Sequence, residues 1–100
     1  MIAKEQRLLR IGVLGCGPIA QFAHFDACRK GRNTELYAIC DAAPDLLERM
    51  TAIHGPARTF AHFEDMLNDS KVEAVIIATS DQFHVPLCTQ ALDAGKHVFV

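Results

Sequence analysis

The fold of this 100-residue chain is decided by one stretch near its start, Leu9-Arg10-Ile11-Gly12-Val13-Leu14-Gly15-Cys16-Gly17-Pro18-Ile19-Ala20. Its first six residues are a short apolar run that ends at Gly15, which is typical of a buried parallel strand. The six residues from Gly15 fit the pattern G-x-G-x-x-G/A, and small and apolar residues at helical spacing follow them. The stretch therefore predicts a strand over residues 9–14, a tight turn, and a helix over residues 19–30.

Strands and helices continue to alternate to the end of the chain. We expect further strands over residues 35–40, 58–60, 72–78 and 97–100, and helices over residues 44–54, 63–68 and 85–94. Such alternation implies right-handed βαβ units and a parallel sheet. The sequence therefore predicts one α/β domain over residues 1–100, with a Rossmann-type doubly wound sheet of order 3-2-1-4-5.

Two of these helices have an apolar side that we expect to face the sheet. In the first helix this side consists of Ile19, Ala20, Ala23 and Ala27. In the last helix it consists of Leu87, Cys88, Ala91 and Leu92. Gly95 follows as the expected cap of the last helix, because glycine readily adopts the left-handed conformation that ends many helices.

Each position of the glycine turn is suited to binding a dinucleotide. Gly15 allows the tight turn, and Gly17 lets the backbone approach a pyrophosphate without a Cβ between them. Ala20 is small enough for close packing of helix on strand, while Pro18 and Ile19 begin a helix whose free N–H groups favour phosphate. The alternative is a purely structural turn that joins a strand to a helix.

An acidic residue, Asp41, ends the second expected strand, 24 positions after Gly17. In this context a carboxylate accepts hydrogen bonds from the hydroxyls of the adenosine ribose, and it repels a 2′-phosphate. The next residues, Ala42-Ala43-Pro44, supply no arginine to neutralise such a phosphate. We therefore expect NAD to be preferred over NADP. Asp41 is also a candidate N-cap of the following helix, but Asp45 is available for that end, so both roles can coexist.

Composition excludes several classes of partner. The formal net charge of −2 gives no reason to expect nucleic acid or an anionic membrane. The apolar runs are too short to cross a bilayer, and the first ten residues do not form a signal peptide. We expect a soluble, cytoplasmic protein that binds neither nucleic acid nor membrane.

The cysteines and most of the histidines indicate no special chemistry. The four cysteines include no CxxC pair, so we expect reduced structural thiols, with Cys16 the one that lies in the glycine turn. No metal site is expected, because metal-ligand spacing is lacking for His24, His54, His62 and His97. The pair Glu64-Asp65 is interpreted as the solvated face of a short helix.

Two later segments carry a resemblance to a known family. Residues 78–84 (Ala-Thr-Ser-Asp-Gln-Phe-His) leave the fourth strand, and residues 90–98 (Gln-Ala-Leu-Asp-Ala-Gly-Lys-His-Val) lead into the fifth. The chain resembles the glucose–fructose oxidoreductase/inositol dehydrogenase (Gfo/Idh/MocA) family over about residues 8–100. In that family, A-T-P-N-x-x-H precedes a helix ending A-L-x-A-G-K-H-V, and a strand then leads to E-K-P.

The resemblance implies roles for residues after the fourth strand. The backbone around Thr79 and Ser80 would line the cofactor, and His84 would lie near its nicotinamide end. A histidine that begins a helix and is hydrogen-bonded locally is the alternative for His84. The family's Pro-Asn is Ser80-Asp81 here, which leaves the role of Asp81 open.

The resemblance also implies that no catalytic residue lies in this stretch. The family's catalytic lysine belongs to E-K-P, which would follow Val100. Lys96 is no substitute, because it matches the family's G-K-H and is expected at the far end of the fifth strand.

These features together predict the cofactor-binding portion of an NAD(P)-dependent oxidoreductase. It would serve hydride transfer between NAD(H) and a hydroxyl or carbonyl carbon of a sugar, cyclitol or polyol, in a homo-oligomer with a second, substrate-binding domain outside these residues. The alternative is a non-catalytic dinucleotide-binding module, such as a nucleotide sensor or an assembly subunit. We also expect the sheet to be cut before its last elements, because residues 98–100 would form a bare apolar edge.

Overall fold

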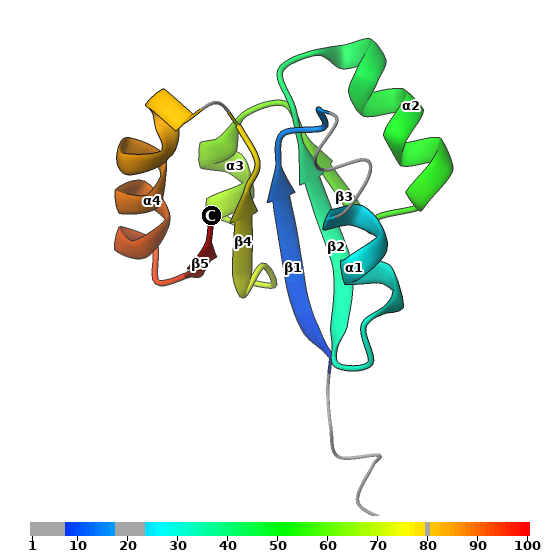
Figure 1. Cartoon of the computed structure of the whole chain (residues 1–100), viewed down its shortest axis with the longest axis horizontal. Helices are drawn as coiled ribbons and strands as arrows, with labels where there is room; N and C mark the ends of the chain where they lie inside the picture. Colours follow the sequence, from blue (N-terminus) through cyan, green and yellow to red (C-terminus); the bar gives the residue numbers. More distant parts are fainter. Residues whose placement is uncertain (1–7, 18–23, 80) are drawn as a thin grey trace, which may run out of the picture.

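The computed structural model describes residues 8–17, 24–79 and 81–100. Figure 1 shows a twisted sheet in the middle of the molecule, with helices on both sides. In chain order the elements are β1 (Leu9–Leu14), α1 (Phe25–Lys30), β2 (Thr34–Cys40), α2 (Pro44–His54), β3 (Arg58–Phe60), α3 (Phe63–Leu67), β4 (Ala74–Ile77), the 3-10 helix η3 (Asp81–Phe83), α4 (His84–Asp93) and β5 (His97–Phe99).

The five strands form one parallel sheet in the order β3-β2-β1-β4-β5. This confirms the predicted doubly wound topology. The chain reverses direction across the sheet between β3 and β4, so β1 and β4 are neighbours at the centre (Figure 1). In sheets of this type the crevice beside such a reversal, at the carboxyl ends of the strands, is the usual ligand site.

The core has two layers, one on each face of the sheet. On one face, Ile11 and Val13 of β1 pack with Phe25 and Cys28 of α1 and Met50 of α2. The other face has a second layer, in which Leu14, Val75 and Ile77 of the strands pack with Phe63 and Met66 of α3 and Ala91 of α4. Alternate strand residues thus serve opposite layers, which is why the strands are almost continuously apolar.

Glycines follow α2 and α4 and end both helices, as predicted for Gly95. Gly55 has φ +61° and donates its N–H to the Thr51 carbonyl at 2.9 Å. Gly95 has φ +80°, and the Lys96 N–H reaches back to the Ala91 carbonyl at 3.1 Å. The second pattern is the Schellman motif, which turns the chain directly into β5.

Several expectations about the elements need correction. The fourth strand is shorter than residues 72–78, because the Val72 N–H bonds to the Asp69 carbonyl at 3.1 Å in the preceding loop. Leu92, expected to face inward, is 61% exposed. Ala27 is also exposed, and Phe25 and Cys28 fill the buried side of α1 instead. The expected helical residues 19–23 lie outside the described part of the chain.

Candidate functional site

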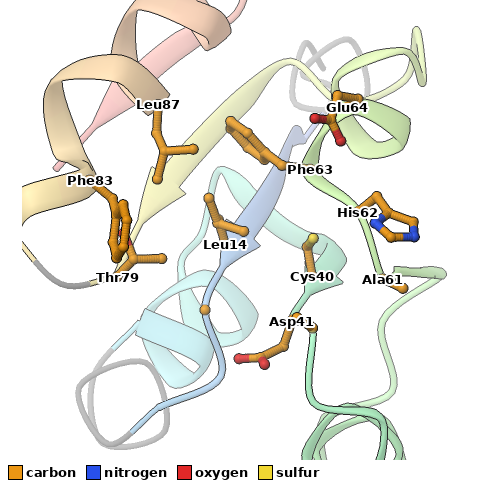
Figure 2. A pocket seen from close by; sticks show the side chains of 12 residues that line it. Leu14, Cys40, Asp41, Ala61, His62, Phe63, Glu64, Thr79, Phe83 and Leu87 are labelled. Carbon is orange, nitrogen blue, oxygen red and sulfur yellow. The ribbon is translucent and has the colours of Figure 1, made fainter.

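A cleft of about 410 Å³ opens at the carboxyl edge of the sheet, where the loops after β1, β2, β3 and β4 meet. Three of the expected site residues, Gly15, Asp41 and Thr79, line it. Figure 2 shows the apolar side chains around it, which come from β1, α3, η3 and α4 and are Leu14, Phe63, Phe83 and Leu87. The topology therefore brings residues that are far apart in sequence to one apolar cleft with a few polar groups on its wall.

The two glycines of the turn have different structural reasons to be glycine. Gly15 has φ +101°, and a Cβ there would lie 2.9 Å from the Ala78 carbonyl oxygen. The fold itself therefore requires glycine at this position. Gly17 does not have a positive φ, and a Cβ built on it meets no atom of the described residues within 4 Å. Within the described residues, neither the backbone conformation nor the packing requires glycine at position 17.

The carboxylate of Asp41 makes two backbone contacts at this edge. Its Oδ2 accepts a hydrogen bond from the Cys16 N–H at 2.7 Å, and its Oδ1 accepts one from the Ala43 N–H at 2.8 Å. The N-cap residue of α2 is Ala43, so Asp41 is not the N-cap, whereas Asp45 lies in the first turn of α2 as expected. A carboxylate has about four acceptor positions, so both oxygens can still accept bonds from a ligand.

Thr79 and His84 lie in the segment that leaves β4. The Thr79 hydroxyl oxygen is buried and has no hydrogen-bond partner among the described residues. The Nε2 of His84 lies 2.8 Å from the Thr79 carbonyl oxygen. A carbonyl can only accept, so this nitrogen carries the proton and donates. The local hydrogen bond expected for a histidine at a helix start is therefore present, and it holds the half-buried His84 ring against the segment that leaves β4.

The cleft is acidic, and the two cysteines at this edge of the sheet, Cys40 in its lining and Cys16 in the glycine turn, are unreactive. Asp41 and Glu64 line the cleft, and no lysine or arginine does so among the residues described. Burial, and then the charge of Asp41, raise the pKa of the Cys16 thiol to about 12. Burial is also the main cause that raises the pKa of the Cys40 thiol to about 12, followed by Asp41. Both thiols are protonated at neutral pH and are poor nucleophiles.

Sequence reasoning missed the contribution of the loop after β3 and of the first turn of α3. His62 and Glu64 both line the cleft (Figure 2), although neither was expected in the site. The signal that could have found them is topological, because the loop after β3 leaves the same carboxyl edge as the glycine turn. Pro18, Ile19, Ala20 and Ser80 are expected site residues that lie outside the described ranges.

Lys96 lies at the opposite edge of the sheet, as expected. Its Nζ donates to the carbonyl oxygens of Asp69 at 3.0 Å and Val72 at 2.7 Å, both in the loop before β4. This confirms that Lys96 has a structural partner set and no access to the cleft. Asp81 begins η3, but its side chain is not described.

The described residues contain neither a metal-binding cluster nor a helix that could span a membrane. Within residues 8–17, 24–79 and 81–100, no group of three or more His, Cys, Asp or Glu is arranged to hold a metal ion. Within the same ranges, none of the helices combines the length and the apolarity needed to cross a membrane.

Comparison with known proteins identifies the family. Residues 9–100 match the Gfo/Idh/MocA family described as "Oxidoreductase family, NAD-binding Rossmann fold". A glycosyl hydrolase family 109 protein of Shewanella putrefaciens (strain CN-32) is 28% identical over 114 residues, which cover 100% of this chain and 24% of the relative. The chain thus spans about a quarter of the length of such curated relatives.

Solved structures of dehydrogenases and reductases share the fold. The scyllo-inositol dehydrogenase from Lactobacillus casei, with bound NAD(H) and scyllo-inositol, is 28% identical with a TM-score of 0.85, covering 92% of this chain and 27% of its own. KijD10, a 3-ketoreductase from Actinomadura kijaniata in complex with NADP, is 30% identical with a TM-score of 0.87, covering 92% of this chain and 29% of its own. With the glycine turn, the acid after β2 and the 3-2-1-4-5 sheet all in place, the chain belongs to the Gfo/Idh/MocA oxidoreductase family and forms its NAD-binding Rossmann fold.

Proposed function

We propose that this domain binds NAD across the carboxyl edge of its sheet and serves an oxidoreductase that acts on a sugar, cyclitol or related polyol. The cofactor, when bound, supplies the hydride chemistry, and the residues of this chain supply binding and orientation. The substrate class rests on the relatives, since one is an inositol dehydrogenase and another a ketoreductase. A second, substrate-binding domain would complete the site, because this chain spans about a quarter of the curated relatives.

The observation that carries the proposal is the contrast between Gly15 and Gly17. The chain itself explains Gly15 through its positive φ and the nearby Ala78 carbonyl. Gly17 borders open space, as far as the described residues extend. Glycine at a position with no internal need for it supports close approach of a pyrophosphate to the backbone.

Two further features fit a bound dinucleotide. The Asp41 carboxylate keeps acceptor positions that could bind the ribose hydroxyls. The Thr79 hydroxyl, buried at the wall of the cleft without a partner among the described residues, is a donor and acceptor that a ligand could satisfy. These two residues and the glycine turn would hold the adenosine and pyrophosphate parts, and His84 would lie toward the nicotinamide end.

The charge of the cleft supports NAD over NADP. Asp41 and Glu64 line it without a lysine or arginine among the described lining residues. A 2′-phosphate beside these carboxylates would be repelled, and Ala42 and Ala43 offer it no cation. The known relatives do not decide this point, because they include both NAD(H) and NADP complexes.

The experiment is a titration of the protein with NAD and NADP, followed by the matched variants Gly17→Ala and Gly15→Ala. We expect tighter binding of NAD than of NADP. Gly17→Ala should weaken NAD binding by about tenfold or more, while its unfolding free energy should stay the same or rise by up to about 1 kcal/mol. Gly15→Ala should destabilise the fold by about 2–3 kcal/mol, because the new Cβ meets backbone at a positive φ.

The outcomes separate the parts of the proposal. Unchanged NAD affinity in Gly17→Ala would contradict pyrophosphate binding at the turn. Equal affinities for NAD and NADP would remove the cofactor preference alone. If a protein that also carries the proposed second domain bound NAD tightly and turned over no polyol, the non-catalytic module would be favoured instead.

A further inference from the structure

The Asp41 side chain joins two segments of the carboxyl edge that are distant in sequence. Its Oδ2 accepts from the Cys16 N–H at 2.7 Å across 25 residues, and its Oδ1 accepts from the Ala43 N–H at 2.8 Å. Hydrogen bonds from N–H groups to a carboxylate are charge-assisted and stronger than neutral ones. The half-buried carboxylate therefore ties the glycine turn to the chain segment that begins α2.

The bond to Cys16 sets the orientation of the peptide between Gly15 and Cys16. In a trans peptide the N–H and C=O point in opposite directions, so a fixed Cys16 N–H also fixes the Gly15 carbonyl. The Gly15 N–H is held separately, by the Cys40 carbonyl at 2.8 Å. Two anchors from β2 and the residue that follows it thus set the direction in which the chain continues to Gly17, where an added Cβ would meet no atom of the described residues within 4 Å.

We propose that Asp41 is a positioning residue for the glycine turn, in addition to its proposed role as a ligand of the adenosine ribose. This inference rests on the proposed function, since it concerns the same cofactor site. Its consequence is specific: affinity for the diphosphate should depend on Asp41 even when the ligand has no ribose hydroxyls. If Asp41 acted only on the ribose, a ligand without those hydroxyls would not sense its loss.

The test compares ADP with 2′,3′-dideoxy-ADP, which keeps the diphosphate and lacks both hydroxyls. Dissociation constants are measured for the wild-type protein, for Asp41→Ala, and for Asp45→Ala as the matched control. Asp45 is an exposed carboxylate in the first turn of α2, so its removal changes the charge nearby without touching the turn. We expect Asp41→Ala to weaken the binding of ADP by about tenfold or more and that of dideoxy-ADP by about threefold or more. Asp45→Ala should change both dissociation constants by less than about twofold.

A second measurement, amide hydrogen exchange followed by NMR, does not depend on any ligand. In Asp41→Ala the Cys16 N–H should exchange faster, while the Gly15 N–H, bonded to the Cys40 carbonyl, should keep its protection. Asp41→Asn, which keeps one carbonyl acceptor, replaces Asp41→Ala if the alanine variant is poorly folded. In Asp41→Asn the Cys16 N–H should exchange faster than in the wild type but more slowly than in Asp41→Ala.

Each outcome decides between the roles. Equal binding of dideoxy-ADP by wild type and Asp41→Ala, or an unchanged Cys16 exchange rate, would overturn the positioning role and leave ribose binding intact. Faster exchange at both amides would also overturn it, because the whole edge would then have opened. If the wild-type protein bound neither nucleotide, the proposed function itself would fail, and the exchange of the Cys16 N–H would still show whether Asp41 holds the turn.

Discussion

The two edges of the sheet use their polar residues differently. At the amino edge, where the strands begin, polar side chains bind to one another and to the backbone of the loop before β4. The Asp69 carboxylate accepts from the Tyr37 hydroxyl at 2.9 Å, and Lys96 Nζ donates to two carbonyls of the same loop. The Arg10 side chain donates to the Lys71 carbonyl at 2.6 Å. These polar groups of the amino edge are therefore hydrogen-bonded within the chain.

The carboxyl edge, by contrast, has groups that the described chain leaves without contacts. The Thr79 hydroxyl has no partner among the described residues, and a Cβ on Gly17 would meet none of their atoms. The Asp41 carboxylate is anchored by two backbone N–H groups yet borders the cleft. The comparison teaches that polar residues of one sheet can be sorted by whether the chain itself satisfies them. The Thr79 hydroxyl, which the described chain does not satisfy, lies where parallel sheets bind ligands, whereas the unsatisfied His54 Nδ1 lies at the amino edge.

The largest effect that tests this division is expected for Asp69→Ala. Burial pushes the pKa of Asp69 up, but hydrogen bonds from the Lys71 N–H and the Tyr37 hydroxyl, with the charges of Arg58 and Lys96, hold it below its ordinary value. Removing the carboxylate leaves the Tyr37 hydroxyl, on a buried residue, without its partner. We expect the unfolding free energy to fall by about 2–4 kcal/mol in urea, with NAD affinity unchanged within about twofold.

The control for this variant is the double replacement Tyr37→Phe with Asp69→Ala. It removes both partners, so it should be more stable than the sum of the two single variants predicts. A loss of NAD affinity in folded Asp69→Ala would show that the amino edge also serves the ligand, and the division between the edges would fail.

Most of the fold could be predicted because its signals are local. The apolar runs gave each strand within two residues at either end, and Gly55 and Gly95 marked where α2 and α4 stop. The error at Leu92 has a physical cause. It follows Ala91, the fully buried centre of the packed side of α4, by one residue, which turns it about 100° away from the sheet. Apolar character alone could not show that α4 exposes it.

The sequence pointed to some residues of the cleft but not to their interactions. Gly15, Asp41 and Thr79 do line one cleft, as strand ends of a parallel sheet should. The bond from Cys16 to Asp41 depends on how the turn is oriented across 25 residues of sequence, which no local pattern encodes. Whether the Thr79 hydroxyl finds a partner likewise depends on how the whole chain packs, and among the described residues it finds none.

A smaller effect, with opposite signs for stability and binding, is expected for Thr79→Val. Valine keeps the shape of the side chain and removes a buried hydroxyl that has no partner among the described residues. We expect the free energy of unfolding without ligand to rise by up to about 1 kcal/mol, and NAD affinity to fall by about threefold or more. Thermal unfolding with and without NAD measures both. If the variant lost stability and bound NAD as before, the hydroxyl would be structural and the carboxyl edge would resemble the amino edge.

The smallest effect is expected at His54, whose ring lies 4.8 Å from that of Phe25 and whose Nδ1 is buried without a partner among the described residues. Burial, followed by the charge of Arg29, lowers the pKa of His54 below its ordinary 6.5, while Asp26 opposes the shift. The imidazole of His54 therefore binds a proton more readily in the unfolded chain than in the folded one. The unfolding free energy should consequently decrease as the pH falls below 6.5.

Urea unfolding from about pH 8 to about pH 5 should consequently show a smaller pH dependence in His54→Phe, which keeps the ring contact, than in wild type or in the control His62→Phe. Equal pH dependence in all three proteins would contradict the role of His54. Because His54 lies at the end of α2 that leads to the start of β3, its replacement should leave NAD affinity unchanged. An altered NAD affinity would mean that the amino edge, where His54 lies, also contacts the ligand. The two edges would then not differ in the way described above.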